Sequence, residues 1–186
     1  MIRLIGVPGS LRASSFNASL LRAAATMVPE GATMSVETIR GIPLYDADVE
    51  AADGIPAAVA ALKDKMAAAD GVVLATPEYN NSIPGVFKNA IDWMSRPPDD
   101  IKRVFRGKHV ALIGATPSGF GTILSQSAWL QTLRFLGMEL WNAERLMVSK
   151  AHTVFDDKGA LTDEATREQL RKYIHGFVDF VRRPKG

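Results

Sequence analysis

Short apolar runs alternate with amphipathic stretches along this chain. Residues 2–7, 72–75 and 109–115 form three nearly continuous apolar runs, and residues 34–39 alternate between apolar and polar positions. Continuous runs of this length are typical of strands that are buried on both faces of a sheet. A further strand, with less distinct ends, is expected within residues 139–148. The pattern therefore predicts five strands.

Between these strands, apolar residues recur at helical spacing. Helices are expected over residues 16–27, from Pro56 to about residue 69, over residues 84–95, and from about residue 123 to 136. Thr162 is the expected N-cap of a last helix. The predicted inward face of that helix holds Leu170, Tyr173, Ile174, Phe177, Val178 and Val181. Alternating strands and helices predict an α/β domain, a parallel sheet with helices on both faces.

Composition narrows the possible classes of protein. The 186 residues predict one domain over residues 1–186, and the 47% of hydrophobic residues are ample for a core. The net charge of +2 and the lack of a dominant basic block argue against a nucleic-acid partner. Since no apolar run approaches about 20 residues and the N-terminus reads directly into a strand, we expect no membrane span and a cytoplasmic location.

Two kinds of chemistry have little support in the sequence. Cysteine is absent, which excludes disulfides and thiolate nucleophiles. His109, His152 and His175 are scattered without the spacing of metal ligands, so no metal site is expected.

Three of the predicted strand-to-helix loops are rich in Gly, Pro, Ser and Asn. They cover residues 8–17, 76–84 and 115–122. Right-handed crossovers place all three at one edge of a parallel sheet. Ligands of such folds bind at that edge, where the strand order reverses. The topology therefore predicts the place of a binding site.

The loop of residues 8–17 suits a phosphate group. Ser10, Ser15 and Asn17 offer hydrogen-bond donors, and Arg12 offers a fixed positive charge. The N–H groups at the start of the following helix also favour an anion. The alternative is a serine-rich turn in which Ser15 or Asn17 only caps the helix.

The loop of residues 76–84 holds an aromatic ring, a carboxylate, two amides and a hydroxyl between two prolines, and suits a flat polar ligand. Neither the P-loop motif nor the dinucleotide fingerprint G-x-G-x-x-G follows the first strand. A single phosphate with flat aromatic chemistry beyond it indicates flavin mononucleotide (FMN).

Two long motifs carry a family resemblance. They are Gly9-Ser10-x-Arg12-x-x-Ser15-x-Asn17 and Pro77-Glu78-Tyr79-Asn80-x-Ser82-x-Pro84-Gly85-x-x-Lys88-Asn89-Ala90-Ile91-Asp92-Trp93. Together they resemble the NADPH-dependent FMN reductase family, including its bacterial quinone, chromate and azo-compound reductases. The resemblance covers nearly the whole chain. It implies a flavodoxin-like fold, a doubly wound five-stranded parallel sheet in the order 2-1-3-4-5, and a homodimer or homotetramer.

The resemblance also implies roles for individual residues. Around the FMN phosphate it places Ser10, Arg12, Ser15, Phe16 and Asn17. Along the flavin ring and ribityl chain it places Pro77, Glu78, Tyr79 and Asn80, and on the other side of the pocket Ser118, Gly119 and Phe120. Asn81 departs from the family pattern, because several relatives have a second tyrosine there.

The expected activity follows from the cofactor. Flavin takes a hydride from NADPH or NADH and passes electrons to a small acceptor, so no side-chain nucleophile is needed. We expect a ping-pong oxidoreductase acting on quinones, chromate or azo compounds. The alternatives are a flavodoxin-type electron carrier and a flavin-binding regulator without turnover. The sequence pI of about 9.0 argues against the carrier, because flavodoxin-type carriers are typically strongly acidic.

Several residues admit two interpretations. Glu78 is a proton donor or, more in keeping with its place in the loop, a structural residue. The basic residues 96–108 are a solvated connector or attract an anionic substrate. Core packing is the simplest role for Trp93, Trp129, Leu133 and Phe135, although the family resemblance favours a subunit interface on their helices.

Overall fold

A parallel sheet forms the centre of the computed structural model, which describes residues 1–183. Its strands are β1 (Ile2–Pro8), β2 (Ala32–Val36), β3 (Gly71–Ala75), β4 (His109–Ala115), β5 (Glu139–Leu140) and β6 (Leu146–Val148). The order is β2-β1-β3-β4-β5, every pairing is parallel, and β6 also pairs with β4. This is the order of flavodoxin-like folds, which confirms the predicted fold.

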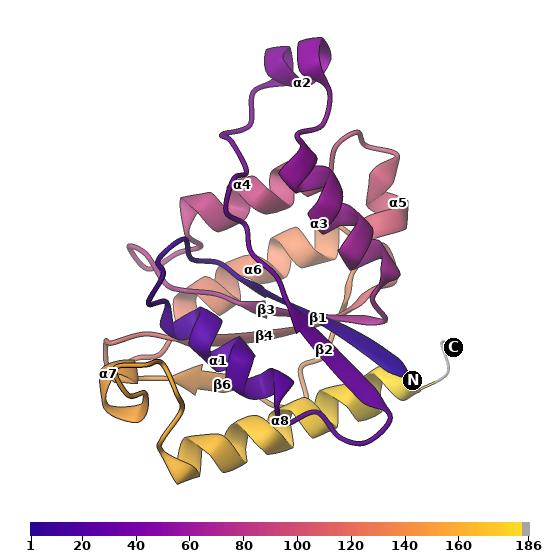
Figure 1. The fold of residues 1–186 in the computed structure, drawn as a ribbon. Helices are drawn as coiled ribbons and strands as arrows, with labels where there is room; N and C mark the ends of the chain where they lie inside the picture. The colour runs from indigo at the N-terminus through magenta and orange to yellow at the C-terminus, as the bar shows by residue number, and fades with distance from the viewer. Residues whose placement is uncertain (184–186) are drawn as a thin grey trace.

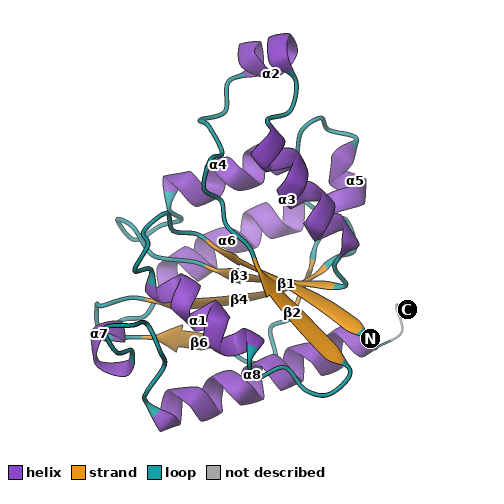
Figure 2. Cartoon of the chain, in the orientation of Figure 1, coloured by secondary structure: helices purple, strands orange, loops and turns teal. Residues whose placement is uncertain are grey.

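Helices cover both faces of the sheet (Figures 1 and 2). They are α1 (Phe16–Ala25), α2 (Ala47–Asp53), α3 (Ala57–Ala68), α4 (Gly85–Met94), α5 (Asp100–Val104), α6 (Ile123–Phe135), α7 (Ala151–Val154) and α8 (Glu164–Arg182). Helices α3, α4 and α6 pack on one face, and α1 and α8 on the other. No helix within residues 1–183 has both the length and the apolar character needed to cross a bilayer.

The strand sequences explain the two cores. Successive side chains of a strand point to opposite faces. In β3, Val72 and Leu74 therefore join the core under α3, α4 and α6, while Val73 and Ala75 join the core under α1 and α8. Every residue of β3 and β4 is buried, as the continuous apolar runs predicted.

The strand expected within residues 139–148 is interrupted. Within residues 139–148 only the short strands β5 and β6 pair with β4, and residues 141–145 leave the ladder between them. The buried ring of Trp141 packs against Tyr173 and Phe177 of α8, at centroid distances of 4.6 and 6.0 Å. This packing accompanies the departure of the chain from the sheet edge, so the prediction of one continuous strand was wrong.

Two other predicted boundaries also need correction. The second strand covers Ala32–Val36 rather than residues 34–39, because its pairing with β1 begins at Ile2 and Ala32. Asp163, not Thr162, caps α8, since the Asp163 carboxylate accepts the Thr166 N–H at 2.7 Å. The sequence pattern also missed α2, α5 and α7, which have seven residues or fewer.

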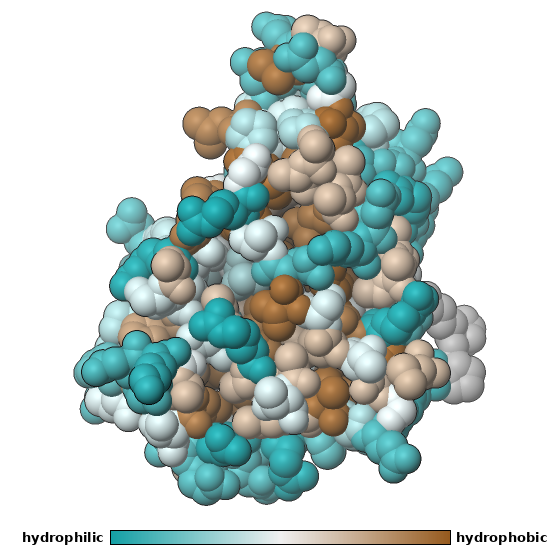
Figure 3. All heavy atoms as spheres, in the orientation of Figure 1, coloured by the Kyte–Doolittle hydropathy of each residue, from teal (hydrophilic) through white to brown (hydrophobic). Residues whose placement is uncertain are grey.

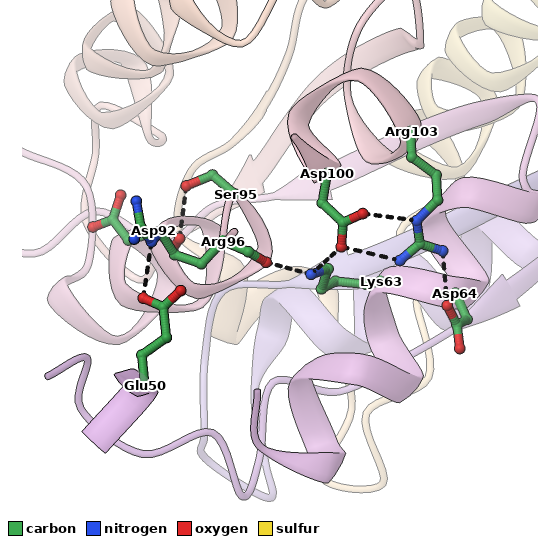
Figure 4. A network of polar contacts seen from close by, with 8 residues as sticks. All are labelled: Glu50, Lys63, Asp64, Asp92, Ser95, Arg96, Asp100 and Arg103. Carbon is green, nitrogen blue, oxygen red and sulfur yellow. Dashed lines mark hydrogen bonds and ion pairs between the residues drawn. The ribbon is translucent and has the colours of Figure 1, made fainter. Parts of the chain in front are cut away.

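A polar network fastens the two short helices α2 and α5 to the domain (Figure 4). The Glu50 carboxylate of α2 lies 2.9 Å from Nε of Arg96, whose hydrogen bond lowers the pKa of Glu50. The buried Lys63 ammonium of α3 contacts both the Asp100 carboxylate of α5 and the Arg96 carbonyl. Because α2 buries no residue and projects from the domain, it depends on such polar contacts for its place.

Candidate functional site

A cavity of about 200 Å³ lies where the loops after β1, β3 and β4 meet. Strand β1 lies between β2 and β3, so the connections from β1 to β2 and from β2 to β3 run in opposite directions across the sheet. Folds of this kind bind ligands at the carboxyl ends of the strands, where the strand order reverses in this way. The lining residues are Ser10, Arg12, Ser15, Phe16, Asn17, Pro77, Glu78, Tyr79, Ala115, Thr116 and Pro117. The structure thus brings together the predicted residues of the first two loops, with the exception of Asn80.

Four predicted site residues lie outside the lining of this cavity. Asn80, Ser118, Gly119 and Phe120 are all exposed, on the two loops that border it. In the third loop the cavity is lined instead by Ala115, Thr116 and Pro117, which lie at the end of β4 and directly after it. The sequence could have indicated these three residues by their position, because residues at the end of a strand lie closest to the edge of the sheet.

Asn17 connects the first loop to the end of β4. Its Nδ2 donates to the Ala115 carbonyl and its Oδ1 accepts the Ala115 N–H, both at 2.9 Å. The side chain is 3% exposed, so both bonds are shielded from water. The observed role of this amide is therefore to hold the two loops of the site together.

The first loop offers an anion a helix N-terminus. Ser15 caps α1, and its Oγ accepts the Ala18 N–H at 3.3 Å. The first turn of a helix leaves N–H groups without intrahelical partners, and its dipole favours negative charge. Ser15 is therefore the N-cap of α1, and the N-terminus of α1 lies at the cavity that Ser15 lines.

Gly9 lets the first loop approach α4 closely. A Cβ atom at this position would lie 2.1 Å from Cδ1 of Phe87, whose ring is fully buried. The Phe87 ring also makes an edge contact with Trp129 of α6 at a centroid distance of 4.9 Å. A side chain at residue 9 would therefore displace the loop or this packed pair of rings.

Glu78 binds the N-terminus of another helix. Its Oε2 accepts the N–H groups of Leu124 and Ser125 of α6, at 2.8 and 3.0 Å. These are among the N–H groups that have no partner within the helix, and a carboxylate is favoured there by the helix dipole. The geometry supports the structural interpretation of Glu78.

Thr76 makes a second connection from the loop after β3 to α6. Its fully buried hydroxyl lies 2.7 Å from the Ser125 hydroxyl and accepts the Trp129 indole N–H at 3.0 Å. Together with Glu78, it fixes the base of the loop.

The tip of the same loop is a tight turn. The backbones of Tyr79 and Ser82 exchange hydrogen bonds of 3.1 and 3.0 Å. Between them, Asn80 and Asn81 have φ angles of 50° and 60°, as in the two-residue hairpin turns that favour Asn and Gly. The turn presents the half-exposed Tyr79 ring beside the cavity.

The donor set fits one end of an FMN molecule. Serine hydroxyls, a guanidinium and a helix N-terminus suit a phosphate, and Glu78, the carboxylate among the described lining residues, is directed to α6. At about 200 Å³ the cavity is smaller than the roughly 300–1,000 Å³ of sites that enclose a ligand. The cavity therefore suits the phosphate end, and a flavin ring would have to lie outside it.

The basic stretch of residues 96–108 mostly serves the fold. Arg96 pairs with Glu50, and Arg103 pairs with Asp64 and Asp100 at 2.8 and 3.2 Å. The Lys108 ammonium donates to the carbonyls of Ala67 and Ala69. These contacts favour a structural connector over a substrate-attracting patch.

Known proteins resemble this chain along its full length. The model of the NADPH-dependent FMN reductase family matches residues 2–153. The NAD(P)H-dependent FMN reductase PA1204 of Pseudomonas aeruginosa is 42% identical over 185 residues, covering 100% of this chain and 98% of the relative. A quinone reductase of Escherichia coli K12 is 37% identical over 188 residues, covering 99% and 97%.

A solved structure agrees with these relatives. FerB, a flavoenzyme NAD(P)H:acceptor oxidoreductase from Paracoccus denitrificans, superimposes with a TM-score of 0.85. It is 30% identical to this chain, and the match covers 97% of each. The resemblance inferred from the two loop motifs is confirmed, and the chain belongs to the NADPH-dependent FMN reductase family.

Proposed function

We propose that this protein transfers electrons from NADPH or NADH to quinones by means of bound FMN. In the proposed ping-pong mechanism, the donor and the acceptor use the same exposed site in turn. Bound FMN would supply the redox chemistry, by accepting a hydride and passing electrons on. The names of the P. aeruginosa and E. coli relatives support the donor, the cofactor and the quinone acceptor.

The observation that carries this proposal is the cavity at the switch point of the sheet. Three loops far apart in the sequence converge there, and residues selected from the sequence for FMN line it. On this proposal Ser10, Arg12 and Ser15 hold the phosphate together with the N-terminus of α1. Asn17 keeps the first loop at a fixed distance from β4.

The rim of the cavity decides which acceptors reach the flavin. Tyr79 is 46% exposed and Phe120 is 84% exposed, so two aromatic rings border an open site. Aromatic rings offer a planar acceptor a stacking surface. We extend the proposal to azo compounds on this basis, and to chromate as a small oxidant that needs no tailored pocket.

An assay of FMN-loaded, desalted protein tests the proposal. With NADPH or NADH and a benzoquinone, we expect continuous oxidation of the nicotinamide at a rate proportional to enzyme. Initial rates at several fixed quinone concentrations should give parallel double-reciprocal lines. Bound FMN without turnover of any quinone would contradict the proposal and support a carrier or a regulator.

We also propose a homodimer or homotetramer. Of the four residues considered for an interface, Trp93, Trp129 and Leu133 are buried in the core, whereas Phe135 is 79% exposed. Helix α6 also exposes Ile123, Leu124 and Leu130. On the face drawn in Figure 3, apolar groups are interspersed with polar ones. Light scattering at assay concentration tests the proposal, and a monomer would contradict it.

A further inference from the structure

The Thr76 side chain makes one hydrogen bond that bears directly on the candidate site. Its hydroxyl lies 2.9 Å from the Pro77 carbonyl oxygen, and Pro77 lines the cavity. A carbonyl oxygen only accepts, so the single proton of the Thr76 hydroxyl is directed to Pro77. The Ser125 hydroxyl, 2.7 Å away, and the Trp129 indole N–H, 3.0 Å away, then both donate to the Thr76 oxygen. These three bonds form one buried network that ends at the Pro77 carbonyl.

The bond from Thr76 fixes the direction of the next backbone N–H group. The peptide between Pro77 and Glu78 is trans. The carbonyl and the N–H of a planar trans peptide point in opposite directions. Since the Pro77 carbonyl is turned toward the fully buried Thr76 hydroxyl, the Glu78 N–H points away from that hydroxyl.

The Glu78 side chain holds the same peptide from its other end. Its carboxylate accepts the N–H groups of Leu124 and Ser125 in the first turn of α6. Ser125 therefore serves both anchors, with its hydroxyl on Thr76 and its N–H on Glu78. The peptide between Pro77 and Glu78 is clamped on both sides, and its rotation would break the bond from Thr76.

The Glu78 N–H is the available backbone donor of this part of the cavity. The residues of the loop after β3 that line the cavity are Pro77, Glu78 and Tyr79. Proline has no N–H, and the Tyr79 N–H donates to the Ser82 carbonyl at 3.1 Å. Within residues 1–183 the Glu78 N–H has no hydrogen-bond acceptor. Glu78 follows the fully buried Thr76 and precedes Tyr79, which is 46% exposed, so this donor lies where the cavity opens.

We propose that Thr76 is a positioning residue for the flavin: it holds the Pro77–Glu78 peptide so that the Glu78 N–H donates to the polar edge of the flavin ring. This inference rests on the proposed function, since it assumes that FMN binds at this cavity. An N–H group that is fixed before the ligand arrives needs no reorganisation when negative charge develops on the reduced ring. Thr76 therefore favours the reduced form of bound FMN over the oxidised form.

Amide hydrogen exchange of the wild type, followed by NMR, tests the contact without any turnover. The probes are FMN, riboflavin, which lacks the phosphate, and inorganic phosphate. We expect FMN and riboflavin to slow exchange of the Glu78 amide by at least roughly tenfold and inorganic phosphate to leave it unchanged. The Tyr79 amide, which already has an acceptor, is the internal control and should change less. Bound FMN without protection of the Glu78 amide, or equal protection by inorganic phosphate, would overturn the inference.

Three variants separate the role of the Thr76 proton from simple stability. Thr76→Val removes the hydroxyl and keeps the shape of the side chain, whereas Thr76→Ser keeps the hydroxyl. Ser125→Ala is the matched control, because it removes another buried hydroxyl of the network and leaves the Thr76 proton on the Pro77 carbonyl. Spectroelectrochemical titration gives the midpoint potential of bound FMN, and urea unfolding of FMN-free protein gives the loss of stability.

We expect Thr76→Val to weaken the binding of reduced FMN by roughly tenfold and that of oxidised FMN by less, which makes the midpoint potential more negative. Thr76→Ser should restore the wild-type potential. Ser125→Ala should keep the wild-type potential although its urea midpoint falls. An unchanged potential in Thr76→Val, or an equal shift in Ser125→Ala, would show a purely structural role and overturn the inference. If Thr76→Val does not fold, the exchange of the Glu78 amide in the wild type decides.

Failure of the proposed function has a different signature. In that case FMN protects the Glu78 amide and the variants order as expected, yet neither NADPH nor NADH reduces the bound FMN.

Discussion

The side-chain amide of Asn17 forms two hydrogen bonds with the backbone of Ala115, both 2.9 Å long, across 98 residues of sequence. This pair joins the loop after β1 to the end of β4, and so links two walls of the candidate flavin site. The same amide was expected at the phosphate, and its observed bonds assign it a positioning role.

Replacement of Asn17 by Ala should destabilise the protein and weaken FMN binding. The Ala115 N–H and carbonyl would lose their partners in a buried setting, which costs about 2–4 kcal/mol in total. Urea unfolding of FMN-free protein measures the loss of stability, and fluorescence titration measures FMN affinity. The exposed Asn142 provides the control variant, Asn142→Ala, for which both quantities should match wild type. An Asn17→Ala protein of unchanged stability would show that the pair does not hold the loops.

Replacement of Glu78 separates its two interpretations. If its carboxylate serves as the cap of α6, Glu78→Ala should lower the free energy of unfolding by about 1–2 kcal/mol. Glu78→Gln keeps an acceptor for the Leu124 and Ser125 N–H groups, so its loss of stability should be smaller, and quinone turnover should stay within about threefold of wild type. Quinone turnover slowed by about 10²–10⁴-fold in Glu78→Gln would instead identify a proton donor.

Replacement of Asp100 should lower the free energy of unfolding more than replacement of its partner Lys63. Lys63 is 2% exposed, so Asp100→Asn leaves a buried ammonium without its counter-charge, at about 2–3 kcal/mol. Lys63→Met removes the charge and keeps an apolar chain of similar length, so the free energy of unfolding should fall by only about 1 kcal/mol or less. Urea unfolding at about pH 7 compares the two variants. Equal losses would contradict the asymmetry.

The contribution of Asp100 should also depend on pH. Hydrogen bonds from Arg103, and then from Lys63, lower the pKa of Asp100 below its usual 3.8. A carboxyl whose pKa is lowered by folding stabilises the folded state above its unfolded pKa, and this stabilisation is lost as the pH falls through the folded pKa. The difference in stability between wild type and Asp100→Asn should therefore be constant from about pH 7 to about pH 5 and shrink below 3.8. A difference that persists at lower pH would contradict this.

A methyl group at Gly9 should disturb the candidate site. The added Cβ would lie 2.1 Å from the Phe87 ring, and such overpacking costs about 1–3 kcal/mol. The double variant Gly9→Ala/Phe87→Leu should lose less stability than the sum of the two single variants, because the smaller leucine side chain leaves room for the added methyl group. Gly85→Ala is the matched control: no atom lies within 4 Å of its added Cβ, and a stability equal to or above wild type is expected. Additive losses in the double variant would exclude the contact with Phe87 as the cause.

The sequence predicted the parts of the fold that depend on local pattern. Every residue of β3 and β4 is buried, so their apolar runs appear directly in the sequence. The flanking loops were recognisable from their composition and motifs. Helix α2, by contrast, buries no residue and therefore has no apolar periodicity to detect.

The features that the sequence did not predict depend on distant partners. The interruption between β5 and β6 involves Trp141 and residues of α8, with α7 between them in the chain. Glu78 and Leu124 are 46 residues apart, and only the folded chain shows that the carboxylate meets the first turn of α6. In the same way, the sequence does not show whether the amide of Asn17 contacts a phosphate or the backbone, because this depends on the position of β4.

The anaerobic visible absorption spectrum of FMN-loaded, desalted protein, recorded before and after addition of NADPH, shows whether the protein holds a flavin that NADPH reduces. We expect flavin bands to survive desalting and NADPH to bleach them rapidly. Flavin bands that persist with both NADPH and NADH, or a protein that retains no flavin and shows no saturable FMN binding, would contradict this expectation.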